Sequence, residues 1–384
     1  MMRKLIISMA AAFAAAALLT SCGQGGHNIT VTNDTDLDRY CETVEISQES
    51  LGGIDLNTVA IVDEAGNAIP SQVYTDIAGN TSLLFQATVP AQTEKTYTIA
   101  EGKQGAYDTL AYSRYVPERM DDYAYENNLV AGRIYGPSLE DPRTFGSDIW
   151  LKCTDRLIID EWYEKADYHH NYGDGMDCYK VANTLGGGAL VPYAGDGEKL
   201  VIGDNYATQI HVCDGPVRTE AVLEYAPFKV GDKMVSATRV LSLDANSRFV
   251  EWATSFHCED ADSIDVVLGA VMHDVVGKKA ELNWIAFTEK ASDSADPDRD
   301  GNISVAVVYD KAELDDNPYY TSGECSNGGE KHAVIITREP VGKAITTWTG
   351  SGWSQGGIES QESWAQLVKD FAYAQQHPLK VKVK

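Results

Sequence analysis

The residues best suited to chemistry lie close together in one stretch, Asp160 to Gly188. This stretch combines aromatic rings, two adjacent imidazoles, carboxylates and glycines in the sequence DEWYEKADYHHNYGDGMDCYKVANTLGGG. A core strand favours alternating β-branched residues, and a solvated loop rarely contains so many rings. Rings beside imidazoles and carboxylates suit a pocket that stacks on a ligand and moves protons at it. The alternative is a glycine-rich loop whose rings cover a core; the pocket is the favoured interpretation.

Cleavage of a carboxylate-bearing sugar by β-elimination needs three groups. A cation must neutralise the carboxylate, a base must remove the adjacent proton, and an acid must protonate the leaving oxygen. The chain offers Arg119 or Arg133 for the first role, His169 or His170 for the second, and Tyr168 or Tyr172 for the third. We therefore predict that these six residues are catalytic.

Arg133 stands inside an otherwise apolar strand, residues 130–135. A buried guanidinium needs a partner, and the carboxylate of a sugar is one candidate. The wider segment, residues 114–136, is rich in Arg, Asp and Glu. A salt-bridged surface turn is therefore the competing interpretation of this segment.

Other side chains are predicted to hold the ligand. Two Trp stand among Gly, Ser and Thr at 346–353, and flat rings in such a setting stack well on the apolar faces of sugars, although a core corner is the alternative. A hydrolase would instead pair carboxylates across the bond, from Asp174 and Asp177 or from Glu126. The predicted substrate-binding set is Trp162, Asp174, Asp177, Tyr179, Glu126, Trp348 and Trp353.

An acidic segment, DSADPDRDGN at 293–302, has the front half of a calcium loop. Asp296, Asp298 and Asp300 occupy its positions one, three and five, and a Gly follows at six. The twelfth position is Val307, so the usual bidentate Glu is missing. These three Asp are the candidate Ca²⁺ ligands, and no other cofactor is indicated; a solvated acidic hairpin loop is the favoured alternative.

Short alternating segments separated by Gly, Asn and Asp recur along the chain, for example at 58–63 and 82–87, and longer ones follow at 216–225 and 233–243. This pattern predicts an all-β sandwich. Near the end, Trp364, Leu367, Val368 and Phe371 fall at helical spacing, which predicts an amphipathic helix packed on a sheet. We see no linker composition or fixed-period repeat, so residues 29–384 are predicted to form a single domain.

The N-terminus reads as an export signal. Two basic residues precede an apolar run, and Leu-Thr-Ser-Cys ends it at Cys22. This ending resembles a bacterial lipoprotein signal, which implies a signal peptide at 1–21, lipidation of Cys22 and a tether at 22–28. The acyl chains would supply the membrane affinity. The tether lacks the acidic run that marks some surface-exported lipoproteins, so we expect the periplasmic face of the outer membrane.

The composition limits the partners. The formal net charge is −26, which repels the phosphate backbone, so nucleic acid is excluded as an expected partner. None of the six cysteines after Cys22 has the close spacing of a zinc or redox site. Their number permits disulfides, but the pairing cannot be read from the sequence.

Several blocks together resemble a family of bacterial secreted proteins and lipoproteins, DUF4861. The resemblance rests on YVPERMDDYAYENN with RIYGP, on WY…YHHNYGDGMDCYKVANTLGGG, and on TGSGW followed by a Trp-bearing C-terminal helix. It implies a galactose-mutarotase-like supersandwich of large antiparallel sheets. It also implies an association with polysaccharide-degradation loci. It does not imply one reaction, because this fold hosts many chemistries.

These observations favour a carbohydrate-active lipoprotein that cleaves uronate-containing oligosaccharides or polysaccharides by β-elimination. Three alternatives remain open. The protein could be a glycoside hydrolase, a sugar epimerase or mutarotase on the same fold, or a glycan-binding lipoprotein without catalysis. The glycan and its linkage are not specified by the sequence.

Overall fold

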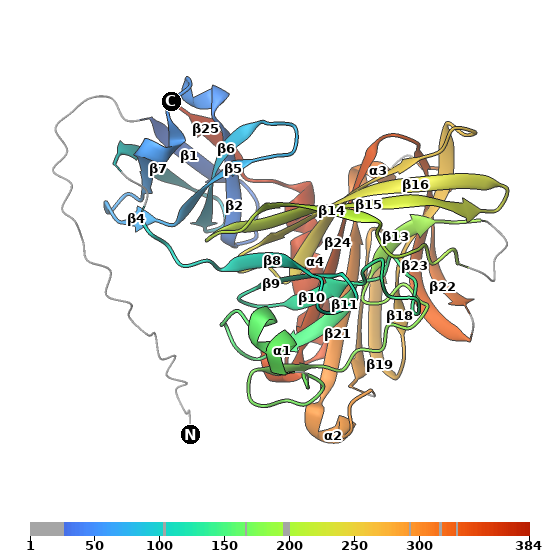
Figure 1. Ribbon diagram of the computed structural model, residues 1–384. Helices are drawn as coiled ribbons and strands as arrows, with labels where there is room; N and C mark the ends of the chain where they lie inside the picture. The colour runs from blue at the N-terminus through green and yellow to red at the C-terminus, as the bar shows by residue number, and fades with distance from the viewer. Residues whose placement is uncertain are drawn as a thin grey trace.

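The computed structural model describes residues 27–102, 105–165, 167–194, 200–291, 293–314, 317–327 and 329–384 (Figure 1). The predicted signal peptide, Cys22 and most of the predicted tether lie outside the described residues, so the lipid anchor and the envelope location stay predictions. Among the helices in these ranges, none combines the length and the apolar character required to cross a membrane.

The two ends of the chain build an N-terminal unit of two sheets. One sheet has the order β25-β1-β7-β3-β4 and the other β2-β6-β5. Alternate residues of their strands, such as Ile29, Val44 and Phe85, fill a hydrophobic core between them. The strands are β1 (Asn28–Asn33), β2 (Arg39–Ser47), β3 (Val59–Val62), β4 (Ala68–Ile69), β5 (Ser71–Thr75), β6 (Thr81–Val89), β7 (Thr93–Glu101) and β25 (Lys380–Val383), with short 3₁₀ turns η1 (Glu49–Leu51) and η2 (Leu56–Thr58).

The main body is dominated by an eight-stranded antiparallel sheet of order β14-β15-β16-β17-β24-β21-β20-β19. Its strands are β14 (Thr208–Cys213), β15 (Arg218–Val230), β16 (Lys233–Asp244), β17 (Phe249–His257), β19 (Val275–Glu281), β20 (Trp284–Lys290), β21 (Asn302–Tyr309) and β24 (Ala344–Trp353). One face of this sheet shares a hydrophobic core with a four-stranded sheet of order β13-β18-β23-β22. That sheet consists of β13 (Ala189–Pro192), β18 (Ser263–Met272), β22 (Thr321–Asn327) and β23 (Glu330–Pro340).

A third element of the main body is a five-stranded sheet of order β12-β11-β10-β9-β8. Its strands are β8 (Ala111–Val116), β9 (Asp122–Asn127), β10 (Ala131–Ile134), β11 (Asp148–Lys152) and β12 (Gly175–Asp177). Every residue of β9 to β12 is buried, so charged side chains on these strands must find partners inside the protein. Helix α1 (Ile159–Lys165) covers this sheet, with Trp162 packed on Trp150.

The predicted C-terminal helix is confirmed as α4 (Gln361–Gln376). Ser360 caps it in a capping box with Ser363. Trp364 is fully buried against the outer face of the eight-stranded sheet, where it stacks on Phe249 and donates a hydrogen bond to the Val305 carbonyl at 3.0 Å. The other described helices are short: α2 (Pro297–Asp300), α3 (Lys311–Leu314) and the 3₁₀ turn η3 (Ser354–Gly356).

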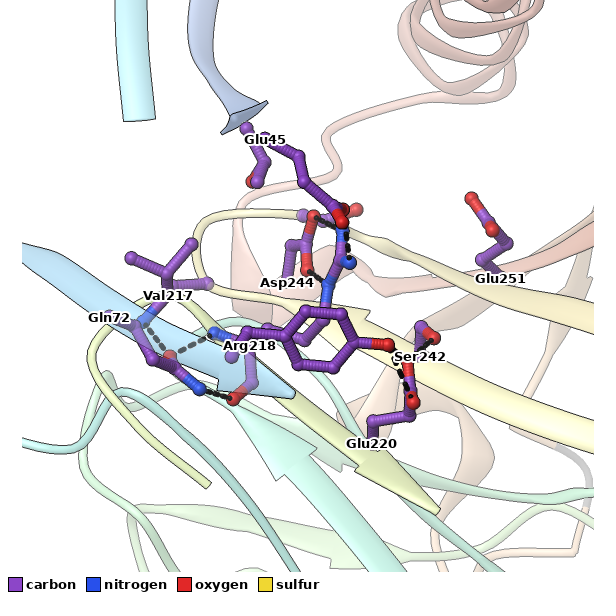
Figure 2. Close-up of polar contacts among 12 residues, drawn as sticks. Glu45, Gln72, Val217, Arg218, Glu220, Ser242, Asp244 and Glu251 are labelled. Atoms are coloured by element: carbon purple, nitrogen blue, oxygen red, sulfur yellow. Dashed lines mark hydrogen bonds and ion pairs between the residues drawn. The ribbon is translucent and has the colours of Figure 1, made fainter. Parts of the chain in front are cut away.

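Polar contacts join the N-terminal unit to the eight-stranded sheet (Figure 2). The Gln72 side chain binds the start of β15 through three hydrogen bonds. Its oxygen accepts from the amides of Val217 and Arg218, and its nitrogen donates to the Arg218 carbonyl. Tyr74 donates to Glu220 at 2.8 Å, and Arg218 reaches both Asp244 and Glu45. In Figure 1 the N-terminal unit, coloured blue, accordingly lies beside the ends of the long strands.

The all-β prediction is confirmed, with large antiparallel sheets and a short C-terminal helix. The single-domain boundary at 29–384 stays a prediction, and the structure adds that residues 27–102 have a hydrophobic core separate from that of the main body. The galactose-mutarotase-like name for the fold also stays a prediction.

We expect Trp364→Ala to lower the free energy of unfolding by about 3–5 kcal/mol, because it leaves a large void between α4 and the sheet. Chemical denaturation followed by tryptophan fluorescence and circular dichroism measures the loss. The exposed Gln375→Ala on the same helix is the matched control and should change stability by less than about 0.5 kcal/mol. An equal loss in both variants would contradict the packing role of Trp364.

Candidate functional site

Arg133 is the centre of a buried charged cluster. It lies on β10 directly opposite Asp148 of β11, and its side chain is only 4% exposed. Its guanidinium donates to Asp148 Oδ2 at 2.8 Å and to Asp177 Oδ2 at 3.1 Å, and Asp122 Oδ2 lies 3.7 Å away. Arg133 of β10 therefore links β9, β11 and the end of β12.

Ionisation of the carboxylates in this cluster is unfavourable because they are buried. Burial raises the pKa of Asp122 to about 6 despite the opposing effect of Arg133 and Arg119. Burial also raises the pKa of Asp177 well above its ordinary value, and neighbouring Asp148 adds to the rise. Three acids around one fully enclosed guanidinium therefore hold protons more tightly than exposed acids do.

The neighbouring aromatic residues complete the enclosure of Arg133. Tyr168 accepts a hydrogen bond from its Nη1 at 3.0 Å, and the rings of Tyr135, Trp150 and Tyr168 lie within 5.2–5.6 Å of its central carbon. The predicted role of Arg133 is thereby corrected: its donors are already occupied by protein carboxylates, so it is not free to neutralise a ligand. Arg119 likewise pairs with Asp122 at 3.2 Å and lies over the Tyr135 ring.

The predicted imidazoles lie on a loop outside this cluster. His169 Nδ1 is 3.0 Å from the carbonyl oxygen of Asp177 and 3.8 Å from its Oδ2, so one of the two predicted bases does meet the Arg133 cluster. His170 and Tyr172 instead point to Asp167, at 3.1 and 3.2 Å. Their catalytic roles stay predictions without direct contact with Arg133.

The predicted carboxylate pairs are each engaged elsewhere. Glu126 is fully buried, forms an ion pair with Lys152 at 2.9 Å and accepts from the amides of Ile158 and Ile159 at the start of α1. Asp174 lies within 3.7 Å of Arg156 and Lys165. Glu126 is thus enclosed by partners inside the protein, whereas the partners of Asp174 are exposed side chains, and a hydrolase role for Asp174 with Asp177 stays a prediction.

The predicted sugar platforms are core residues. Trp353 is 1% exposed and donates from Nε1 to the Asp300 carbonyl, and Trp348 packs beneath α4 while bonding Glu251. Trp162 and Tyr179 are also buried, the first on Trp150 and the second with its hydroxyl bonded to the Val271 carbonyl. All four rings are buried, so Trp348 and Trp353 fit the alternative of a core corner, while Trp162 and Tyr179 fit the alternative of rings that cover a core.

The predicted Ca²⁺ loop is a short helix in the structure. Asp296 is the N-cap of α2, and Asp300 pairs with Arg299 at 2.8 Å and accepts from the Ser294 hydroxyl. Asp298 is exposed on the helix. Across the ranges that the structure describes, no group of three or more His, Cys, Asp or Glu is arranged to hold a metal ion.

A pocket of about 240 Å³ opens next to the Arg133 cluster, on the far side of Asp177. The segment that follows Asp177 forms one wall, the ends of β18 and β20 form another, and the start of β23 and the segment before α2 close it. It is lined by Cys178, Lys180, His273, Glu289, Lys290, Asp293 and Glu330. The Asp160–Gly188 stretch therefore does contribute to a pocket, through its last third rather than through its imidazoles.

His273 and Glu289 form an ion pair in this pocket. His273 Nδ1 lies 2.7 Å from Glu289 Oε1, and the His273 amide donates to the other oxygen at 2.9 Å. Glu289 is buried, and the Tyr179 ring packs edge-on against the imidazole at 5.3 Å. Burial alone would lower the pKa of His273, but the hydrogen bond and charge of Glu289 raise it above its ordinary value.

The cations of the pocket are available to a ligand. Lys180 and Lys290 are both exposed, and among the residues described neither forms an ion pair within 4.0 Å. The pocket thus brings two lysines and an imidazole together on a chain with 57 acidic and only 31 basic residues. Three carboxylates, Glu289, Asp293 and Glu330, line the same pocket, so the two lysines are the groups that an anionic part of a ligand could meet.

Sequence reasoning predicted no role for His273 and missed its partner Glu289. The two residues face each other because the chain turns back between β18 and β20, where the Lys290 amide donates to the Asp274 carbonyl at 3.0 Å. The available signal was a polar residue close behind each of two apolar runs: His273 directly follows residues 266–272, and Glu289 follows residues 284–287 after one Thr. Without the strand pairing, that signal does not show which ends meet.

The sequence profile described as "Domain of unknown function (DUF4861)" matches residues 31–381. "Uncharacterized protein P7" of Formosa agariphila is 29% identical over 401 residues, which cover 96% of this chain and 97% of that protein. Among solved structures, a protein in glycosyl hydrolase family 38 from Enterococcus faecalis is similar with a TM-score of 0.48 and 8% identity, over 94% of this chain and 47% of that one. An alpha-mannosidase from E. faecalis V583 gives 0.43 and 8%, over 94% and 46%. This chain therefore spans about half the length of these solved structures.

The Arg133 cluster predicts a pH dependence of stability. Because the folded-state pKa of Asp122 lies above its ordinary value of 3.8, the folded protein binds more protons than the unfolded chain between about pH 4 and 6. Wild-type stability relative to Asp122→Asn should therefore fall as pH rises through this window, by up to about 3 kcal/mol, and level off above it. Urea unfolding of both proteins from pH 4 to 7 measures the difference, with the exposed Asp260→Asn as control. A difference that grows with pH would contradict the assignment.

Proposed function

The chain belongs to the DUF4861 family, and from the pocket we propose that it acts on acidic sugars, with His273 removing a proton beside the carboxylate of a bound uronate-type residue. The observation that carries the proposal is the His273–Glu289 pair, 2.7 Å apart, at the pocket surface. The buried carboxylate orients the imidazole through Nδ1, and the ring also has a hydrogen-bonding contact with the Lys180 backbone. A ligand would exchange protons with Nε2 by taking the place of that contact. Such a pair is the usual basis of acid–base catalysis by histidine.

The lining of the pocket supports a sugar acid as the ligand. All its residues except Cys178 carry ionisable nitrogen or oxygen groups, which suits a molecule rich in hydroxyls and poor in apolar surface. Lys180 and Lys290 can pair with the sugar carboxylate, while Asp293 and Glu330 can accept hydrogen bonds from hydroxyls. At about 240 Å³ the space is smaller than the roughly 300–1,000 Å³ of drug-sized sites, so it fits one sugar unit.

The reaction we propose is β-elimination. Charge from the two lysines stabilises the carboxylate as its neighbouring carbon loses a proton to His273. The electron pair left on that carbon forms a double bond to the next ring carbon, whose bond to the glycosidic oxygen breaks. The imidazolium then returns its proton to the departing oxygen. The products are an unsaturated uronate and a shortened sugar with a free hydroxyl.

An envelope location is part of the proposal, because glycans of this kind are met outside the cytoplasm. We expect Cys22→Ser to move the protein from the membrane fraction to the soluble fraction, since it removes the residue to which acyl chains would attach. Fractionation followed by immunoblotting measures the shift. Recovery of both forms in the membrane fraction would contradict lipid anchoring at this residue.

We expect His273→Gln to lower the turnover of uronate oligosaccharides by about 10²–10⁴-fold, because the proton-transfer group is lost. The measurement is the ultraviolet absorbance of the unsaturated product over a panel of uronate-containing glycans. The control is His257→Gln, an exposed histidine at the end of β17, with thermal melts to verify folding. Full activity of His273→Gln would contradict the role of His273.

Glu289→Gln separates a chemical role from a structural one. Without the carboxylate the pKa of His273 should fall, so the acid limb of the pH–rate profile should move to lower pH as the maximal rate drops.

The products formed by the wild-type protein distinguish the alternative activities. New reducing ends without unsaturated product would indicate a hydrolase. Interconverted sugars would indicate an epimerase or mutarotase, and binding without turnover would indicate a glycan-binding protein.

A further inference from the structure

Three exposed rings occur within four residues of the loop that leads into the pocket wall. The side chains of His169 and His170 are 62% and 57% exposed, and Tyr172 is 65% exposed. Single exposed rings are ordinary on a protein surface and need no explanation. A group of three on one loop, beside a pocket that the rings do not enter, points to a ligand that extends beyond the pocket.

The loop is joined directly to the pocket wall. The Asp177 amide donates to the Tyr168 carbonyl at 2.8 Å, and the Asp177 carbonyl lies 3.0 Å from His169 Nδ1. The next residue, Cys178, lines the pocket. His169 therefore contacts the residue that immediately precedes the pocket wall.

A second set of contacts ties the loop to the segment that contains α2. The Asn171 side chain donates to Gln355 at 3.2 Å, and Gln355 donates to the Arg299 carbonyl at 3.0 Å. Arg299 lies in the segment that begins at Asp293, which lines the pocket. Two segments far apart in the sequence are thus joined, and each of them leads to a residue that lines the pocket, Cys178 or Asp293.

The rings are held in place before any ligand arrives. Both oxygens of Asp167 are used, one 3.1 Å from His170 Nδ1 and the other accepting from the Tyr172 hydroxyl at 3.2 Å. The ring centres of His170 and Tyr172 are 6.4 Å apart. The return of the loop is fixed by Gly175 at φ +139°, where a Cβ would lie 1.9 Å from the Leu151 carbonyl oxygen. Such ordering reduces the entropic cost of stacking on a ligand.

We propose that His169, His170 and Tyr172 form an outer subsite, which stacks on the sugar units adjoining the one in the pocket. The preferred ligand is then an acidic oligosaccharide rather than a single sugar acid. This inference rests on the proposed function, because it extends the same site. In this outer subsite the apolar faces of the rings bind the ligand. The subsite is consistent with a pocket that holds only one sugar unit.

Binding as a function of ligand length tests the subsite. The full-length His273→Gln protein, in which turnover is blocked, is titrated by calorimetry with the monomers and trimers of galacturonate, glucuronate and mannuronate. We expect a trimer to bind at least about tenfold more tightly than its monomer, and Tyr172→Ala to reduce this ratio about three- to tenfold. The matched control is Tyr40→Ala: Tyr40 is 71% exposed and its hydroxyl also bonds an aspartate, Asp38 at 3.0 Å, but it lies on β2 in the N-terminal unit.

The outcomes separate the two proposals. If monomers bind but trimers bind no more tightly, or if Tyr40→Ala reduces the ratio as much as Tyr172→Ala, the outer subsite is refuted and the pocket proposal stands. If no uronate of either length shows saturable binding, while the exposed-residue variants melt like the wild type, the proposed function is refuted and the subsite with it.

Discussion

The enclosure of one guanidinium fixes the region on which the proposed site depends. A buried arginine must be neutralised within the protein, and Arg133 obtains its partners from β9, β11 and β12. Asp177 is the last residue of β12, so the contact that neutralises Arg133 also fixes the chain immediately before Cys178 and Lys180. The pocket wall is therefore held by an electrostatic requirement of the core. The same requirement explains why Arg133 cannot itself serve a ligand.

What could be predicted from the sequence was whatever depends on local pattern. Alternation gave the strands, helical spacing at Trp364 and Val368 gave α4, and ring-rich composition located a chain segment that reaches a pocket. Roles that depend on burial were assigned wrongly. A Trp among small residues looks the same whether its face meets a sugar or the underside of a helix, and only the packing of Trp348 beneath Phe371 decides between them.

Pairs of residues that meet across neighbouring strands were the other limit. Glu289 is sixteen residues from His273, and Lys180 comes from a different sheet region, so no spacing rule connects them. Their meeting follows from strand register, which a single sequence does not reveal. The net charge of the chain also gives no information on this point. Although the chain is strongly acidic, two lysines that form no ion pair with any described residue line one pocket together with three carboxylates.

The N-terminal unit has a consequence for how the chain is made. Its strand β1 pairs with β7 on one side and with β25 on the other, and Asn28 and Lys384 exchange two backbone hydrogen bonds. In Figure 1 the last strand, red, accordingly completes a blue sheet. Contacts between the two ends of a chain have the highest possible sequence separation, which slows folding. The sheet that contains β1 therefore keeps an open edge until residues 380–383 are available to pair with it.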